Sequence, residues 1–308
     1  MHKITTILVA LCTLVLTTSA SLAMQVSSGK LETIEAFKSK YIGDRKVMVW
    51  LPDGYSEDTQ YAVLYMHDGQ MLFDADTTWN KQEWGVDEVA GKLQASGKTK
   101  PFIVVAAFNG GDLRYPEYLP QKPWKALSRD QKYDVLQTST DDKNVDIENI
   151  IRSDNYLKFL VGELKPYIDK TYSVHTDREN TFVAGSSMGG LISMYAIGEY
   201  PEIFGAAACI STHWPGSEKP DWTAITDQFM TYLAENVPDP GMHRIYFDYG
   251  DQTLDAVYPP MQAKADEIMQ AKGYDDTNWL TVYDRGAAHD ETSWRARLHR
   301  PLIFLLGI

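Results

Sequence analysis

Short runs rich in β-branched and aromatic residues alternate along this chain with longer segments in which apolar residues recur every three or four positions. A strand followed by a helix, repeated, is typical of parallel sheets. The alternation therefore predicts an α/β fold: a mostly parallel central sheet of about eight strands, with helices on both faces. The first two strands have no helix between them, so we expect them to pair antiparallel at the sheet edge. The strands are expected at residues 31–37, 46–51, 61–67, 102–108, 181–185, 206–211, 244–249 and 279–283, and the helices at 86–93, 154–172, 188–199, 224–235, 259–272 and 291–306.

The chain begins with the layout of a secretory signal peptide. Lys3 precedes an apolar run at residues 4–16, and small residues follow up to Ala23. The apolar run is shorter than the roughly 20 residues that a membrane-spanning helix needs. We therefore expect residues 1–23 to be a signal peptide, the mature protein to be periplasmic or secreted, and no stable membrane association after cleavage.

Residues 24–308 are expected to form a single domain, because their length suits one α/β domain with one large core. Cys12 lies in the expected signal peptide and Cys209 stands alone, so no disulfide is expected within the mature chain. Removing Lys3 leaves 28 of the 29 basic residues against 42 acidic ones, a formal net charge of −14. A chain this acidic repels nucleic acid and anionic membranes, which argues against both as partners.

Residues 109–153 interrupt the alternation of strands and helices. The segment is long and polar, and it contains several aromatic and acidic residues. Long insertions of this kind are often lids or binding loops. Because it follows the fourth expected strand, it should emerge at the carboxyl edge of the sheet, where ligands of open α/β sheets bind. We interpret it as a lid-like insertion.

A Gly-x-Ser-x-Gly motif joins one expected strand to the helix that follows it. The motif reads Gly185-Ser186-Ser187-Met188-Gly189. It arises by chance in roughly one chain in ten of this length, but its place between strand and helix is what a nucleophile elbow requires. The spacing makes Ser187 the expected nucleophile, since Ser186 does not fit the pattern.

A serine nucleophile needs a histidine base, oriented by a carboxylate. In the fold that uses this elbow, the acid follows a later strand and the histidine follows the last one. His289 lies in a small-residue loop after the last expected strand. His299 lies inside the last expected helix, where the neighbouring Arg295, Arg297 and Arg300 indicate a solvent-exposed stretch.

The acid is expected in the loop after residues 244–249, which offers Asp251 and Asp255. Asp255 lies just before the next helix and is favoured, while Asp251 is suited to capping the turn. Both alternatives stay open from the residues alone.

The oxyanion of an ester-cleaving site needs two backbone N–H donors. One is expected at Met188, directly after the nucleophile, and the other in the loop after the third strand, at Gln70. His67 and Asp68 in that loop suggest a metal site, but no second ligand pair stands at zinc spacing, so we expect structural roles for them. The predicted mechanism requires no metal and no other cofactor.

Several segments together resemble the putative esterase family, the esterase D-like and enterobactin esterase-like branch of the α/β-hydrolases. The matching segments are residues 64–70, 117–120, 159–169, 185–190, 254–256 and 286–289, with Trp294. The resemblance implies the α/β-hydrolase fold, with Ser187 as nucleophile, His289 as base and Asp255 as orienting acid. The family includes feruloyl and acetylxylan esterases, enterobactin-type esterases and mycolyltransferases. Residues 109–153 do not match the pattern of one family activity.

The sequence thus predicts a serine carboxylic-ester hydrolase that acts through an acyl-enzyme on a small-molecule ester. Candidate substrates are acylated carbohydrates and siderophore lactones. An acyltransferase with the same triad, or a catalytically silent binding protein of the same fold, are the alternatives. Substrate contacts are expected from Arg114, Tyr118, Trp124 and Trp214, and Trp84 is assigned equally to the site or to the core.

Overall fold

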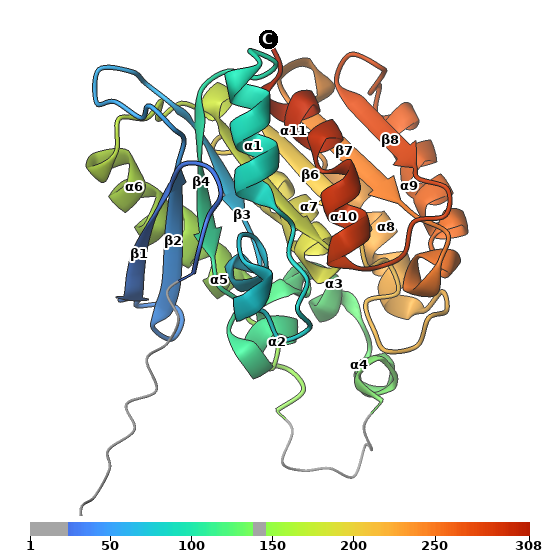
Figure 1. The fold of residues 1–308 in the computed structure, drawn as a ribbon. Helices are drawn as coiled ribbons and strands as arrows, with labels where there is room; N and C mark the ends of the chain where they lie inside the picture. The colour runs from blue at the N-terminus through green and yellow to red at the C-terminus, as the bar shows by residue number, and fades with distance from the viewer. Residues whose placement is uncertain (1–23, 138–145) are drawn as a thin grey trace, which may run out of the picture.

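The computed structural model describes residues 24–137 and 146–308 (Figure 1). The expected signal peptide, residues 1–23, lies outside the described residues, as do residues 138–145 of the expected insertion. Eight strands form one sheet in the order β1-β2-β4-β3-β5-β6-β7-β8. The strands are β1 (Lys30–Phe37), β2 (Arg45–Leu51), β3 (Ala62–Met66), β4 (Phe102–Ala107), β5 (Thr181–Ser186), β6 (Ala206–Ile210), β7 (Arg244–Tyr249) and β8 (Trp279–Tyr283).

The pairing of the strands confirms the predicted fold class. β1 pairs antiparallel with β2, and β2 pairs antiparallel with β4. From β4 to β8 every neighbouring pair is parallel. The carboxyl ends of these strands therefore meet at one edge of the sheet, where the chain can gather functional groups from loops that are distant in sequence.

Helices cover both faces of the sheet (Figure 1). α1, α10 and α11 pack on one face, and the other helices pack on the opposite face. Strand residues alternate between the two cores: in β2, Val47 and Val49 join one and Met48 and Trp50 join the other. The helices are α1 (Val86–Ala95), α2 (Arg114–Tyr118), α3 (Gln121–Ala126), α4 (Arg129–Leu136), α5 (Ser153–Phe159), α6 (Lys165–Thr171), α7 (Met188–Glu199), α8 (Ala224–Asn236), α9 (Pro259–Ala271), α10 (Glu291–Arg297) and α11 (His299–Leu306).

Two of the expected helices are interrupted. A π-helical segment at Leu160–Leu164 separates α5 from α6, and Leu298 separates α10 from α11. Proline explains both interruptions, because Pro166 and Pro301 have no N–H for the carbonyl four residues earlier. Within residues 24–137 and 146–308, no helix has both the length and the apolar character that crossing a membrane requires.

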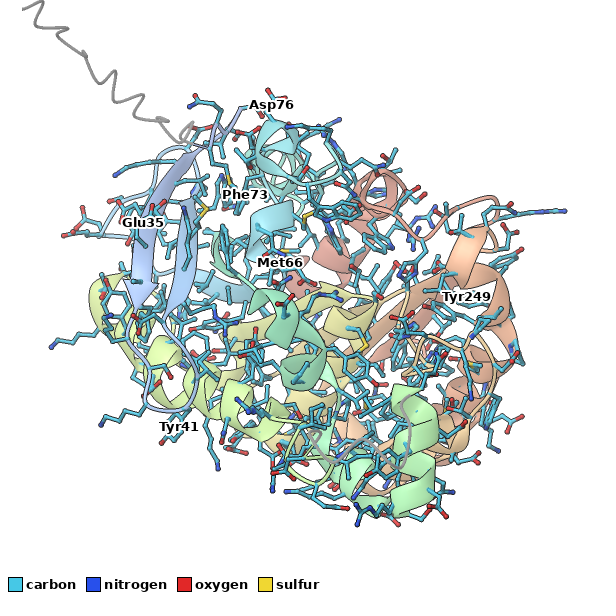
Figure 2. All side chains as sticks on the ribbon, turned by 90° about the horizontal axis from the view of Figure 1, so that it is seen from below. Glu35, Tyr41, Met66, Phe73, Asp76 and Tyr249 are labelled. Atoms are coloured by element: carbon cyan, nitrogen blue, oxygen red, sulfur yellow. The ribbon has the colours of Figure 1, made fainter. Side chains whose placement is uncertain are left out.

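The described part of residues 109–153 forms short helices below the sheet in Figure 1. Figure 2 views the molecule from that side, with Met66, the last residue of β3, near the centre and Tyr249, the last residue of β7, to one side. Buried side chains from α2, α3 and α4 belong to the same core cluster as the sheet. The described part of the insertion is therefore packed against the domain.

Candidate active site

Ser187 lies at the turn between β5 and α7. Its backbone has φ 58° and ψ −122°, a conformation that residues with a side chain rarely adopt. The turn is tight: a Cβ added to Gly185 would lie 2.8 Å from the carbonyl carbon of Gly189. The strand therefore passes directly into the helix and presents Ser187 at the point of the turn.

Replacing Gly185 with alanine is expected to destabilise the fold by about 1–3 kcal/mol, the usual cost of overpacking, because backbone atoms of α7 would have to move. Gly189→Ala is the matched control. The nearest atoms to its added Cβ outside its own helix are 3.5 Å away, an ordinary contact, and alanine favours the helix. Urea unfolding of both variants measures the difference, and equal stabilities would contradict this account of the turn.

His289 is paired with Asp255. Its Nδ1 lies 2.6 Å from Oδ1 of the carboxylate, and its backbone N–H donates to Thr253 Oγ1 at 2.8 Å. The imidazole is 13% exposed and the carboxylate is fully buried. Because an ionised carboxylate only accepts hydrogen bonds, this pairing assigns the ring proton to Nδ1 and leaves Nε2 as the base.

The second oxygen of Asp255 is also held. Ser211 Oγ and the Gly250 backbone N–H each donate to its Oδ2 at 2.6 Å. Burial alone raises the pKa of the Asp255 carboxyl, but the hydrogen bond and charge of His289, with these two donors, outweigh burial and hold the pKa below its usual range. The carboxyl is therefore ionised at neutral pH.

The structure separates the two candidate acids. Asp251 is partly exposed and accepts hydrogen bonds from the Tyr283 hydroxyl at 2.5 Å and from the Gly286 backbone N–H at 2.8 Å. It thus ties the loop after β7 to the loop after β8. Asp255 is the acid that contacts His289.

A buried ionic layer lies behind Asp255. The Arg297 guanidinium donates to Ser211 Oγ at 2.7 Å and to Asp248 Oδ1 at 3.1 Å, and it lies 3.8 Å from Asp255 Oδ2. The expectation of a solvent-exposed Arg297 is therefore wrong, since its side chain is 1% exposed. His299, by contrast, is exposed as expected. One buried cation balances one of two buried carboxylates, so a negative charge remains to stabilise a protonated His289.

Ser187 and His289 line one cavity of about 510 Å³. The cavity carries three carboxylates and one guanidinium besides the histidine. Its lining residues are Asp68, Gln70, Met71, Trp79, Asn80, Gln82, Trp84, Asn109, Arg114, Ser186, Ser187, His289, Asp290, Glu291 and Trp294. Residues from the loops after β3, β4, β5 and β8 thus meet at the carboxyl edge of the sheet.

The two expected oxyanion donors lie beside this cavity. Met188 is the first residue of α7, and the first N–H groups of a helix have no acceptor within the helix. Gln70 lies in a short 3₁₀ turn (Gly69–Met71), and its side-chain oxygen accepts from the Asn109 N–H at 3.2 Å. The Gln70 side chain is thus engaged elsewhere, so any contribution to an oxyanion site would come from its backbone N–H.

Of the four residues expected to contact the substrate, one lines the cavity and three do not. Arg114 lines the cavity and forms a two-pronged ion pair with Asp68, with both distances 2.8 Å. Tyr118, Trp124 and Trp214 are fully buried and do not line the cavity. Each buried polar group has a partner inside the protein: the Tyr118 hydroxyl accepts from the Asp68 N–H, and the two indole N–H groups donate to Ile147 and Gln262. These three expectations are corrected, because the side chains pack in the core.

His67 and His213 are buried away from the cavity. His67 Nδ1 lies 2.8 Å from the Tyr156 hydroxyl, and His213 Nδ1 lies 2.9 Å from the Tyr258 hydroxyl. Burial is the main cause that lowers the pKa of each imidazole to about 4, so both are neutral at physiological pH. Among the described residues, no cluster of three or more metal-binding side chains is present.

Sequence reasoning missed the rim of the cavity. Trp79, Asn80 and Gln82 lie in the loop between β3 and α1, and Asp290 and Glu291 lie where α10 begins. The sequence did contain one indication of these residues: both segments follow parallel strands, so they were expected at the carboxyl edge of the sheet. Trp84, which the sequence left undecided, lines the cavity while being 3% exposed.

Known proteins resemble this chain in sequence, among them the following two. The endo-1,4-β-xylanase/feruloyl esterase of Xylanibacter ruminicola is 27% identical over 264 residues, which cover 82% of this chain and 28% of that protein. The uncharacterized protein YbbA of Bacillus subtilis is 25% identical over 272 residues, which cover 86% of this chain and 94% of that protein. This chain therefore spans well under half of the first relative.

Solved structures share the fold at low sequence identity. A ferulic acid esterase from Anaeromyces mucronatus, solved with ferulic acid, has a TM-score of 0.59 at 20% identity, with 91% of this chain and 92% of that chain covered. The enterobactin esterase of Shigella flexneri has a TM-score of 0.61 at 17% identity, with 92% and 60% covered. An IroE-like serine hydrolase from Shewanella oneidensis has a TM-score of 0.62 at 16% identity, with 89% and 78% covered.

A family model described as putative esterase matches residues 39–305, which include every strand from β2 to β8 and every residue of the candidate triad. A match over this length covers most of the chain. The chain therefore belongs to the putative esterase family.

Proposed function

We propose that this protein is a serine carboxylic-ester hydrolase that works through an acyl-enzyme. The observation that carries the proposal is the shared cavity: Ser187, held in a strained turn, lines the same cavity as His289, whose Nδ1 is held by the buried Asp255. Membership of the putative esterase family supports it. A strained serine costs stability, and such strain clusters at sites of function.

In the proposed reaction, His289 Nε2 takes the proton of Ser187 as the serine Oγ attacks the ester carbonyl. The carbonyl oxygen becomes an oxyanion, for which the backbone N–H groups of Met188 and Gln70 are the proposed donors. The tetrahedral intermediate then expels the alcohol, which leaves with the proton from His289. Water, activated by the same imidazole, hydrolyses the acyl-enzyme and restores the serine.

Asp255 supports both steps through its charge. It fixes the imidazole with Nδ1 protonated and stabilises the imidazolium that forms in each step. The buried Arg297 and Asp248 approximately cancel one another next to it. Asp255 therefore remains the charge that orients His289 and stabilises its protonated form.

The names of the relatives suggest the class of ester. They include feruloyl esterases and an enterobactin esterase. We propose acylated carbohydrates or a siderophore lactone as the substrate. The aromatic side chains of Trp79, Trp84 and Trp294 in the cavity suit an ester that carries flat rings.

The purified protein is expected to hydrolyse p-nitrophenyl acetate and to be inactivated by one equivalent of a fluorophosphonate, because an activated serine attacks phosphorus as it attacks a carbonyl. Peptide mass spectrometry should find the adduct on Ser187. Hydrolysis that survives the reagent, or an adduct on another serine, would overturn the proposed nucleophile. Transfer of the acetyl group to an added alcohol in preference to water would instead identify an acyltransferase.

A further inference from the structure

Trp79 is the most exposed aromatic side chain among the large hydrophobic residues of the described chain. It is 84% exposed, whereas Trp222, another exposed tryptophan, is 41% exposed. Trp79 nevertheless lines the cavity that contains Ser187 and His289. A bare indole at the mouth of a cavity offers a flat apolar surface that a ligand can cover.

The segment around Trp79 is held by polar contacts. Asn80 Nδ2 donates to Glu291 Oε2 at 2.8 Å, and Thr292 Oγ1 donates to Gln82 Oε1 at 3.1 Å. An ion pair of 2.6 Å joins Glu83 to Arg295. The loop between β3 and α1 is thus clamped to the start of α10, the helix that follows the loop carrying His289. The indole is therefore presented on a fixed support, which reduces the entropy lost on binding.

The charge beside Trp79 is negative. The ionised groups that line the cavity are Asp68, Asp290 and Glu291 against Arg114, and Asp68 is already paired with Arg114. Asp290 accepts a hydrogen bond from the Ser293 N–H, and Glu291 accepts one from Asn80. In residues 24–137 and 146–308, neither Asp290 nor Glu291 forms an ion pair, although Arg114 also interacts electrostatically with Glu291. The net charge that a bound ester would meet is therefore negative.

We propose that Trp79, Asp290 and Glu291 form a specificity-determining subsite, which rests on the proposed esterase function. Trp79 stacks on a flat ring of the ester, and the two carboxylates reject rings that carry negative charge. The subsite selects neutral or cationic ring-bearing esters. A metal-loaded catecholate lactone, which is a polyanion, is disfavoured relative to an uncharged acylated sugar or aryl ester.

Three acetate esters test the subsite: 4-acetoxybenzamide has a neutral ring, 4-acetoxybenzoate has an anionic ring, and methyl acetate has none. For Trp79→Ala, kcat/KM on 4-acetoxybenzamide relative to methyl acetate should fall roughly 3–10-fold, mainly through KM, as expected for the loss of one aromatic pair. Trp79→Phe should restore most of this ratio, and Trp222→Ala should leave it unchanged. An unchanged ratio in Trp79→Ala would overturn the proposed stacking.

The charge is tested with Glu291→Gln, which keeps an acceptor for Asn80. With both rates corrected for spontaneous hydrolysis, this variant should raise kcat/KM on 4-acetoxybenzoate relative to 4-acetoxybenzamide by at least 2-fold. In the wild type, added salt should reduce the difference in kcat/KM between the two esters, because salt screens the carboxylate charge. Glu235→Gln, which makes the same charge change on α8, controls for net charge. An equal effect of both variants would overturn a local role for Glu291.

A binding measurement distinguishes a failure of the subsite proposal from a failure of the esterase proposal. Titration calorimetry of Ser187→Ala with 4-acetoxybenzamide should show a Kd that rises 3–10-fold when Trp79→Ala is added. If the wild type hydrolyses none of the esters but this Kd still depends on Trp79, the esterase proposal fails and the subsite stands. If esters are hydrolysed and the Kd does not depend on Trp79, the subsite fails and the esterase proposal stands.

Discussion

Ser187→Ala is expected to reduce kcat for p-nitrophenyl acetate by about 10³–10⁶-fold, the range found when a triad serine is removed. The loss is large because the hydroxyl forms the covalent bond, and no other group in the described cavity lies at the point of the turn. The free energy of unfolding should change little or rise. An alanine at φ 58° remains strained, but the buried packing around it is unchanged. Stopped-flow assays and urea unfolding of the same preparation measure both quantities.

Ser186→Ala is the matched control for this variant. Ser186 also lines the cavity and is 5% exposed, but it is the last residue of β5 and lies outside the turn. Its loss should reduce activity far less than the loss of Ser187. Loss of activity in Ser186→Ala, with Ser187→Ala still active, would show that the motif has been placed one residue out of register.

The fold was largely predictable because its signals are local. The parallel strands β3 to β6 are short apolar runs buried at every position, and helical patterns follow them, so the type and the order of the elements could be derived from neighbouring residues. α7 begins and ends as predicted, at Met188 and Glu199. The interruptions at Leu160–Leu164 and Leu298 were not predicted, although Pro166 and Pro301, which have no backbone N–H, explain them.

Burial of individual side chains was not predictable in the same way. Arg297 lies between Arg295 and His299, which are both exposed, and a pattern of neighbours gives no sign that it is buried. Its partner Asp248 is 49 residues away in the sequence. Whether such a cation is buried depends on where two strands and a helix meet, which is a property of tertiary packing.

The same limit applies to the aromatic residues. Trp124 and Trp214 were expected in the site because they follow the ends of strands, yet both are fully buried, while Trp79 in a similar position is exposed. All three are tryptophans in segments that follow parallel strands. The difference lies in tertiary packing. Trp124 is part of α3 and its indole N–H donates to the Ile147 carbonyl, and the Trp214 indole N–H donates to Gln262 of α9, whereas the Trp79 side chain is 84% exposed.

Asp255→Asn is expected to reduce kcat by about 10³–10⁴-fold, as removal of the triad carboxylate does in other serine hydrolases. An amide beside His289 Nδ1 can present its NH₂ group, which favours the tautomer protonated on Nε2, and that tautomer cannot accept the serine proton. The change also removes one of two buried carboxylates, so Arg297 and Asp248 alone remain and the imidazolium loses its counter-charge. The pH dependence of kcat, measured from pH 5 to 9, checks this result.

Asp251→Asn distinguishes the two acids, because both variants remove one negative charge from the same loop. An asparagine at 251 keeps one oxygen that can accept from the Gly286 N–H, and its NH₂ group can donate to the Tyr283 hydroxyl oxygen, so kcat should stay within a few-fold of the wild type. Thermal unfolding must accompany the assay, since the buried Asp255 has three donors and its loss can also weaken the fold. An Asp255→Asn variant that is folded and active would remove the acid from the proposed triad and leave Ser187 and His289 as a pair. Loss of activity in Asp251→Asn alone would mean that the loop after β8, which Asp251 ties through Gly286, positions His289 more strongly than its own carboxylate does.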